Sequence, residues 1–134
     1  LWVCGGGEKV TLKILAKYGD YGNWDVDVDG FIHKSEILKN HCEQQERDFS
    51  SIKKTLHTNV IIGENQKDLE NKIEKISTVT GIPKEMYIDK PLVGTQEKVF
   101  NTVDEFKSVD CSYIIAYIPD IVWGNSLEIL SEKI

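Results

Sequence analysis

The sequence predicts an α/β protein that forms one domain over residues 1–134, with a parallel sheet of about four strand–helix units. Two patterns predict this class. Short apolar segments alternate with helical periodicity about every 25–40 residues, and such alternation implies right-handed crossovers between parallel strands. The run Tyr113–Pro119 is almost wholly apolar, which is typical of a strand covered on both faces of a parallel sheet.

The first two units are predicted over residues 1–45. Leu1–Cys4 is a short apolar strand that ends on glycines, and a helix follows from Lys9 to about Gly19. We expect this helix to bury one face made of Val10, Ile14, Leu15 and Tyr18. A second strand, Tyr21–Val26, precedes a helix that Asp29 should cap and that should end near Gln45. Its expected buried stripe is Phe31, Leu38 and Cys42.

The third unit begins with a strand over Ile52–Ile62. Its two faces alternate, with Leu56, Thr58, Val60 and Ile62 on one and His57, Asn59 and Ile61 on the other. Asn65 then caps a helix, which Asp68 and Lys72 support as an i,i+4 pair. The helix should end at Gly81-Ile82-Pro83, and its apolar stripe is Leu69, Ile73, Ile76 and Val79.

The last unit follows a less regular segment, Lys84–Gly94, which we interpret as a short helix and an extended piece. Thr95 should cap an extra helix that turns Val99, Val103 and Phe106 inward. The final strand is Cys111–Pro119. The final helix should present Trp123, Leu127, Leu130 and Ile134 on one face.

Composition and charge exclude several functional classes. With 40% hydrophobic and 28% charged residues, the chain resembles a folded globular domain. Its net charge of −6, with no basic stripe, argues against nucleic-acid binding. No segment approaches the roughly 18 apolar residues of a membrane helix. The cysteines Cys4, Cys42 and Cys111 lack zinc spacing, so we expect reduced thiols in a cytoplasmic protein and no bound metal.

The glycine turn Gly5–Gly7 is the strongest chemical feature of the sequence. A strand that runs through glycines into a helix leaves backbone N–H groups pointing outward, and the helix dipole adds positive potential there. Glycine lets an anion approach the backbone closely, and the hydroxyl of Thr11 could donate to a phosphate oxygen. The alternative interpretation is a plain tight turn, with Glu8 favourable at the helix start.

Four segments resemble luciferase-like oxidoreductases. Residues 1–20 are similar to the fifth strand and following helix of that family, and Tyr21-Gly22-Asn23-Trp24 is similar to its Asp-Gly-Trp-Asn strand, with Asn and Trp exchanged. The stretch His41–Ile52 resembles the Cys-x-x-x-Gly-Arg-Asp-Pro-x-x-Ile connection, with Glu46 for glycine and Phe49 for proline. Leu92–Val99 resembles Leu-x-Gly-Thr-Pro-Glu-x-Val, with Gln96 for proline.

This resemblance implies strands five to eight of a TIM (β/α)8 barrel, the C-terminal half of a longer enzyme. It also implies hydride transfer between coenzyme F420, or alternatively FMN, and a small organic substrate, with the fragment inactive alone. The family's cofactor-phosphate positions fall on Gly6, Gly7, Glu8 and Thr11, within the turn that begins at Gly5. Glu8 would contact phosphate through its backbone N–H, because its carboxylate would be repelled.

The other candidate residues give weaker evidence of function. Asn23, Trp24 and Asp25 follow the second strand, but Trp24 is better explained as core. We assign no role to any histidine, and the sequence identifies no catalytic residue, metal site, P-loop or nucleophile elbow. A half-barrel would expose two sheet edges and one apolar face, so we expect a homodimer. The alternative function is a non-catalytic half-barrel scaffold or a module that binds a phosphate ligand.

Overall fold

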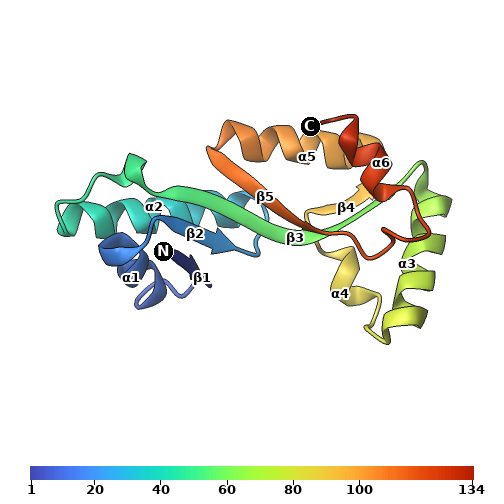
Figure 1. Cartoon of the computed structure of the whole chain (residues 1–134), viewed down its shortest axis with the longest axis horizontal. Helices are drawn as coiled ribbons and strands as arrows, with labels where there is room; N and C mark the ends of the chain where they lie inside the picture. Colours follow the sequence, from blue (N-terminus) through green and yellow to red (C-terminus); the bar gives the residue numbers. More distant parts are fainter. The chain divides into compact units, whose positions relative to one another are not determined.

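A computed structural model describes all residues from 1 to 134. Strands and helices alternate along the chain, with one short helix and one short strand inserted before the last long helix (Figure 1). In order, the elements are β1 (Trp2–Cys4), α1 (Thr11–Tyr18), β2 (Tyr21–Trp24), α2 (Val28–Gln44), a 3-10 turn (Phe49–Ser51), β3 (Lys53–Gly63), α3 (Gln66–Thr80), α4 (Glu85–Ile88), β4 (Leu92–Thr95), α5 (Gln96–Ser108), β5 (Cys111–Tyr117) and α6 (Ser126–Ser131).

The strands form one sheet in which β1, β2, β3 and β4 follow in order and β5 also pairs with β3. The pairs β1–β2, β2–β3 and β3–β4 are parallel, so the predicted α/β class with a parallel sheet is confirmed. The register aligns Cys4 with Asn23 and Asn23 with Thr55. The extended piece predicted before Thr95 is a true strand, β4, which pairs with the end of β3.

The chain divides into two compact units. One contains residues 1–57 and 106–115, and the other contains residues 58–105 and 116–134. The long strand β3 contributes to both, since its first residues pair with β2 and its last residues pair with β4. Each unit has its own core.

The core of the first unit is aromatic and lies between the sheet and its helices. Trp24, Phe31 and Phe106 are buried, and their rings meet edge to face at centroid distances of 5.1 Å and 5.7 Å. The predicted stripe of α2 is confirmed, because Phe31, Leu38 and Cys42 are all fully buried. The helix is capped by Asp27, whose carboxylate accepts from the Gly30 N–H at 2.8 Å. The prediction of Asp29 as the cap was therefore wrong by two residues.

The buried face of α1 differs from the prediction. Leu12, Leu15 and Ala16 are buried, whereas Val10, Ile14 and Tyr18 are exposed. Both faces of this short helix carry apolar side chains, so periodicity alone could not choose between them. Packing decides: α1 lies against α2 and β1, and a Cβ added to Gly22 of β2 would sit 2.5 Å from Leu15. Leu15 therefore faces the sheet.

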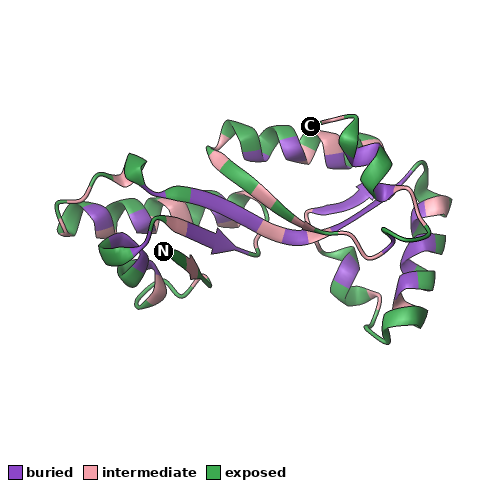
Figure 2. Cartoon of the chain, viewed as in Figure 1, coloured by how far each residue is buried: buried purple, intermediate pink, exposed green.

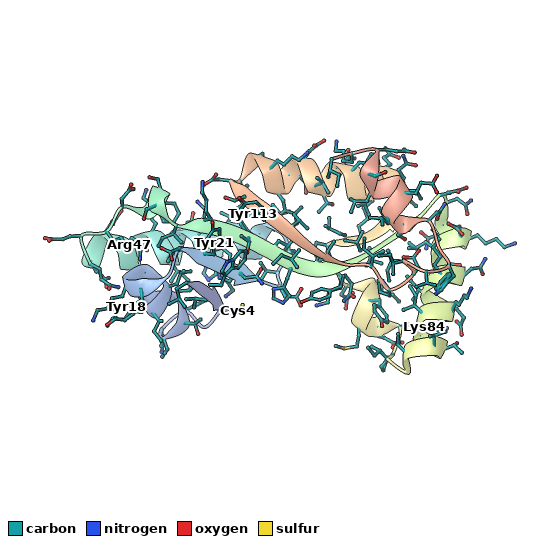
Figure 3. The ribbon with its side chains drawn as sticks, viewed as in Figure 1. Cys4, Tyr18, Tyr21, Arg47, Lys84 and Tyr113 are labelled. Atoms are coloured by element: carbon teal, nitrogen blue, oxygen red, sulfur yellow. The ribbon has the colours of Figure 1, made fainter.

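Arg47 joins the α2–β3 connection to the end of α1. Its guanidinium donates to the carbonyls of Gly19 at 2.6 Å and Ala16 at 3.4 Å. Arg47 is labelled in Figure 3. The last carbonyls of a helix have no partner within the helix, and a cation is favourable there. The next residue, Asp48, caps the 3-10 turn by accepting from the Ser50 N–H at 2.9 Å. The Arg-Asp pair in this connection thus has a structural role.

The second unit has a mostly aliphatic core between α3, α4 and the ends of β3 and β4. It contains Ile61, Leu69, Ile73, Ile76, Tyr87 and Val93. The predicted limits of α3 are confirmed, since Asn65 accepts from the Asp68 N–H at 3.0 Å and Gly81 ends the helix with φ of 70°. The predicted pair Asp68–Lys72 is present at 3.2 Å. Val79, expected in the stripe, is exposed.

Two predictions at the end of the chain were wrong. β5 was expected to be covered on both faces, but Tyr113, Ile115 and Tyr117 are exposed along one of them (Figure 2). An apolar strand predicts burial only where a second layer is present to cover it. In α6, Ile129 and Leu130 are buried, whereas the expected stripe residues Trp123, Leu127 and Ile134 are not. The helix begins only at Ser126, so its phase is shifted.

Candidate functional site

The predicted glycine turn lies between the end of β1 at Cys4 and the start of α1 at Thr11. Gly5 has φ of +104°, which side-chain-bearing residues rarely adopt. A Cβ on Gly6 would meet the Lys34 side chain at 2.5 Å, and one on Gly7 would meet Thr11 Oγ1 at 2.9 Å. A side chain would therefore be strained at Gly5 and would clash at Gly6 and Gly7. The turn lies at the carboxyl end of a parallel strand.

Some amides of this turn are already used within the chain. The Gly5 N–H donates to the Asn23 carbonyl at 3.1 Å, and the Leu12 N–H donates to the Gly7 carbonyl at 3.0 Å. The N–H groups of Gly6, Gly7 and Glu8 have no acceptor in the chain. Gly7 and Glu8 are exposed. The N–H groups of Lys9 and Val10 also have no acceptor in the chain, and α1 begins without a side-chain cap.

Thr11 lies beside these amides. It is the first residue of α1 and is partly buried, and its Oγ1 is close to the place where a Gly7 side chain would be. A hydroxyl here can donate to an anion that the turn amides also contact. The structure therefore brings together all five residues predicted for the site, Gly5, Gly6, Gly7, Glu8 and Thr11.

The structure adds three cationic or titratable side chains from α2 that the sequence did not predict. Lys34 Nζ donates to the Gly6 carbonyl at 2.8 Å and lies 3.5 Å from Glu8 Oε1. His33 Nε2 donates to the same carboxylate oxygen at 3.0 Å, and His41 Nε2 donates to the Glu8 carbonyl at 2.9 Å. Lys34 and His41 are seven residues apart, so they share a helix face. Only the packing of α2 against α1 shows that this face meets the turn.

The charge on Glu8 is stabilised by these contacts. The hydrogen bond from His33 holds the pKa of Glu8 below its usual value of 4.5, and the nearby charges of His33 and Lys34 act in the same direction. The carboxylate is therefore ionised at neutral pH. Lys34 is the more enclosed partner, with 16% of its side chain exposed against 45% for Glu8.

The second candidate set, Asn23, Trp24 and Asp25, does not form one site, because Asn23 and Trp24 lie on opposite faces of the sheet. Trp24 is 1% exposed and packs in the aromatic core, as the core interpretation predicts. Asn23 points to the other face of the sheet, where its carboxamide accepts from Thr55 Oγ1 at 3.0 Å and lies 3.9 Å from Cys4 Sγ. The aligned register of the three strands produces this row.

The same face of the sheet carries an aromatic row one step earlier along the strands. Trp2 and Tyr21 stack at 4.4 Å with an interplanar angle of 3°, and Tyr113 lies 6.3 Å from Tyr21. Tyr21 and Tyr113 are labelled in Figure 3. Trp2 and Tyr113 are 45% and 54% exposed. This aromatic row is therefore partly exposed, whereas Asn23 and Thr55, further along the same face, are buried; Cys4 is exposed beside the glycine turn.

No group of three or more His, Cys, Asp or Glu side chains is arranged to hold a metal ion. None of the helices has both the length and the apolar character required to cross a bilayer.

Comparisons with known proteins identify the fold. No protein-family model matches the sequence, and no curated protein sequence matches it. Solved structures do match over the whole chain. An F420-dependent secondary alcohol dehydrogenase, in complex with an F420–acetone adduct, matches 100% of the chain with a TM-score of 0.73 and 12% identity. The coenzyme F420-dependent tetrahydromethanopterin reductase from Methanopyrus kandleri matches 99% with a TM-score of 0.69 and 12% identity.

A riboflavin lyase with modified FMN and riboflavin also matches 99% of the chain, with a TM-score of 0.71 and 12% identity. The chain spans about half of these proteins, covering 47% of the dehydrogenase, 49% of the reductase and 41% of the lyase. The resemblance predicted from four sequence segments is thus confirmed at the level of the fold. The chain has the fold of the luciferase-like oxidoreductases, over about half of their barrel.

Proposed function

We propose that this chain is the C-terminal portion of a luciferase-like oxidoreductase and that its glycine turn holds the phosphate of a flavin or deazaflavin cofactor. The observation that carries the proposal is the open row of amides at Gly6, Gly7 and Glu8, beside the Thr11 hydroxyl. Such a row at the carboxyl end of a parallel strand, next to a helix start, is the usual geometry for phosphate binding in α/β folds.

The residues present fit a phosphate group. Glycine at 6 and 7 leaves the amides accessible, Thr11 supplies a hydroxyl donor, and Lys34 brings a positive charge to the turn. Coenzyme F420 is the first candidate, because the matched dehydrogenase and reductase are described as F420-dependent, and FMN is the alternative. A bound cofactor of this kind would supply the hydride-transfer centre.

The residues of this chain would bind and orient the cofactor. In this proposal the turn fixes the phosphate, and the sheet face with Cys4 and Asn23 lies directly before it along β1 and β2. The titratable pair at this site, His33 and Glu8, is hydrogen-bonded to itself at 3.0 Å, and we assign it no catalytic role. The small organic substrate would then be positioned by residues outside this chain, and we expect the chain alone to be catalytically inactive.

A second function, a non-catalytic scaffold or phosphate-ligand module, is favoured by two observations. The chain covers only 41–49% of the enzymes that share its fold, and the aromatic row on the sheet of the first unit is partly exposed. A second copy of the chain could cover that row, and we propose a homodimer as the assembled form in either case.

Binding of FMN and of riboflavin to the chain tests the phosphate proposal, because riboflavin lacks the phosphate. We expect FMN and F420 to shift the amide signals of Gly6 and Gly7 in NMR spectra and to bind more tightly than riboflavin. Thr11→Val removes the hydroxyl donor and keeps the shape of the side chain, so it should weaken FMN binding about fivefold while leaving riboflavin binding unchanged. Thr102→Val on the exposed face of α5 is the matched control.

Two outcomes would count against a cofactor-binding enzyme. Equal affinity for FMN and riboflavin, with no response at the turn, would overturn the phosphate site. Cofactor binding without hydride transfer to reduced nicotinamide, alcohols or sugars, measured after the chain is joined to the other half of a barrel, would favour the scaffold function.

A further inference from the structure

The Glu8 carboxylate occupies the position where the cationic side chains of α2 meet the glycine turn. Its Oε1 accepts from His33 Nε2 at 3.0 Å and lies 3.5 Å from Lys34 Nζ. A carboxylate oxygen has the same acceptor chemistry as a phosphate oxygen. Glu8 therefore holds, within the chain itself, the charge and donors that a phosphate on the turn would require.

We propose that Lys34 and His33 form the cationic half of the phosphate site, and that Glu8 is an internal occupant that the phosphate displaces. The inference rests on the proposed phosphate function of the turn. In this inference, the affinity of the site for phosphate depends on competition between the Glu8 carboxylate and the incoming phosphate dianion.

The backbone and the side chain of Glu8 are held separately, which makes displacement feasible. His41 Nε2 fixes the Glu8 carbonyl at 2.9 Å, and Lys34 Nζ fixes the Gly6 carbonyl at 2.8 Å. These two bonds anchor the turn to α2 whether or not the carboxylate is in place. The Glu8 side chain is 45% exposed, so it can rotate into solvent without disturbing buried groups.

The Lys34 ammonium group lies close enough to the turn to contact an anion bound there. Only 16% of its side chain is exposed, and its methylene groups pass so close to Gly6 that a Cβ there would overlap them. The ammonium group is therefore held at the turn by packing and pays little further ordering entropy on binding. The ammonium group lies at the Gly6 carbonyl and 3.0 Å from the place of a Gly6 Cβ, so a phosphate bound against Gly6 would meet it.

The inference is tested by titrating the full ¹⁵N-labelled chain with inorganic phosphate and then with FMN, following the amides of Gly6 and Gly7. Glu8→Gln removes the competing charge and should tighten phosphate binding about two- to fivefold, the range of an exposed ion pair. Lys34→Met should weaken it about tenfold, because a hydrogen bond to a charged group is lost. Lys34→Arg keeps the charge and should stay within about twofold of the wild type.

Lys39→Met is the matched control. It removes the same charge from an exposed position of the same helix, so it should change phosphate affinity less than about twofold, through screened long-range attraction only. If Lys34→Met fails to give a dispersed NMR spectrum, Glu8→Gln still decides the matter.

Three results are distinguishable. Tighter binding by Glu8→Gln together with the loss in Lys34→Met supports the inference. Weaker or unchanged binding by Glu8→Gln, or equal effects of Lys34→Met and Lys39→Met, overturns it and leaves the phosphate function of the turn intact. No response of the wild-type turn to phosphate or FMN overturns both.

Discussion

At the scale of single residues, Gly5 and Gly81 differ in how strongly their backbone conformation requires glycine. Both have positive φ, +104° and +70°, but Gly81 ends α3 in open space whereas Gly5 lies at the entrance of the turn. A φ near +70° is the left-handed region that other residues tolerate at modest cost, and +104° is outside it. We expect Gly5→Ala to lower the free energy of unfolding by about 2–3 kcal/mol and Gly81→Ala by about 1 kcal/mol. Urea unfolding followed by circular dichroism measures both, and equal losses would contradict this assignment.

Glu8 gives the turn a dependence on pH. Its pKa is lowered in the folded chain, chiefly by the hydrogen bond from His33, so its contribution to stability is present above 4.5 and is lost as the pH falls through the lower folded value. The groups that face its carboxylate are His33 and Lys34. We expect Glu8→Gln to reduce the fall in urea midpoint between neutral pH and pH values below 4.5. Glu43→Gln, an exposed carboxylate near the end of α2, should leave that fall unchanged.

At the scale of elements, Arg47 connects the end of α1 to the start of β3. Replacing it by methionine leaves the carbonyls of Gly19 and Ala16 without their donor, and the expected loss of stability is about 1.5–3 kcal/mol. Lys17→Met removes a charge from the exposed last turn of the same helix and should cost less than about 0.5 kcal/mol. Amide hydrogen exchange in α1 should accelerate in the first variant only. Equal exchange in both would mean that Arg47 does not hold the helix end.

A second connection holds α6 to the end of β3. Ser126 Oγ accepts from the Ile62 N–H at 2.9 Å and donates to the buried Asp120 carboxylate at 2.7 Å. Ser126→Ala leaves the buried Ile62 N–H without an acceptor and removes one of two hydrogen bonds to the Asp120 carboxylate, so we expect a loss of about 2 kcal/mol in urea unfolding. Ser131→Ala, which removes an exposed hydroxyl bonded to the Glu128 carbonyl, is the control and should cost less than about 1 kcal/mol. Similar losses in the two variants would show that the buried bonds of Ser126 contribute little.

The elements also show what a sequence can and cannot predict. Caps such as Asn65 and ends such as Gly81 were predictable, because their physical causes are local. The buried face of α1 and the exposed face of β5 were not, because both depend on which layers the chain supplies. The same distinction applies to the site. Gly5–Gly7 and Thr11 are close in sequence, whereas Lys34 reaches Gly6 across 28 residues through the packing of α1 on α2.

At the scale of the whole molecule, we expect the exposed aromatic row on the sheet to decide whether the chain associates in solution. In the first unit this row contains the stacked pair Trp2–Tyr21 and the neighbouring Tyr113, and Trp2 and Tyr113 are each about half exposed. A contiguous aromatic patch of this kind on a sheet is typical of an interaction surface. The proteins that share the fold are about twice as long as the chain.

We therefore expect the isolated chain to self-associate at micromolar concentration through this face, as a two-fold dimer in which each copy covers the other. Tyr113→Ser removes an aromatic ring from the face and should weaken association about tenfold or more, because central aromatic residues dominate such interfaces. Val122→Ser alters a side chain that is 91% exposed outside the sheet, and it should leave association unchanged. Light scattering and sedimentation measure both variants. A stable wild-type monomer at these concentrations, or equal effects of the two substitutions, would show that the aromatic face is not the contact surface.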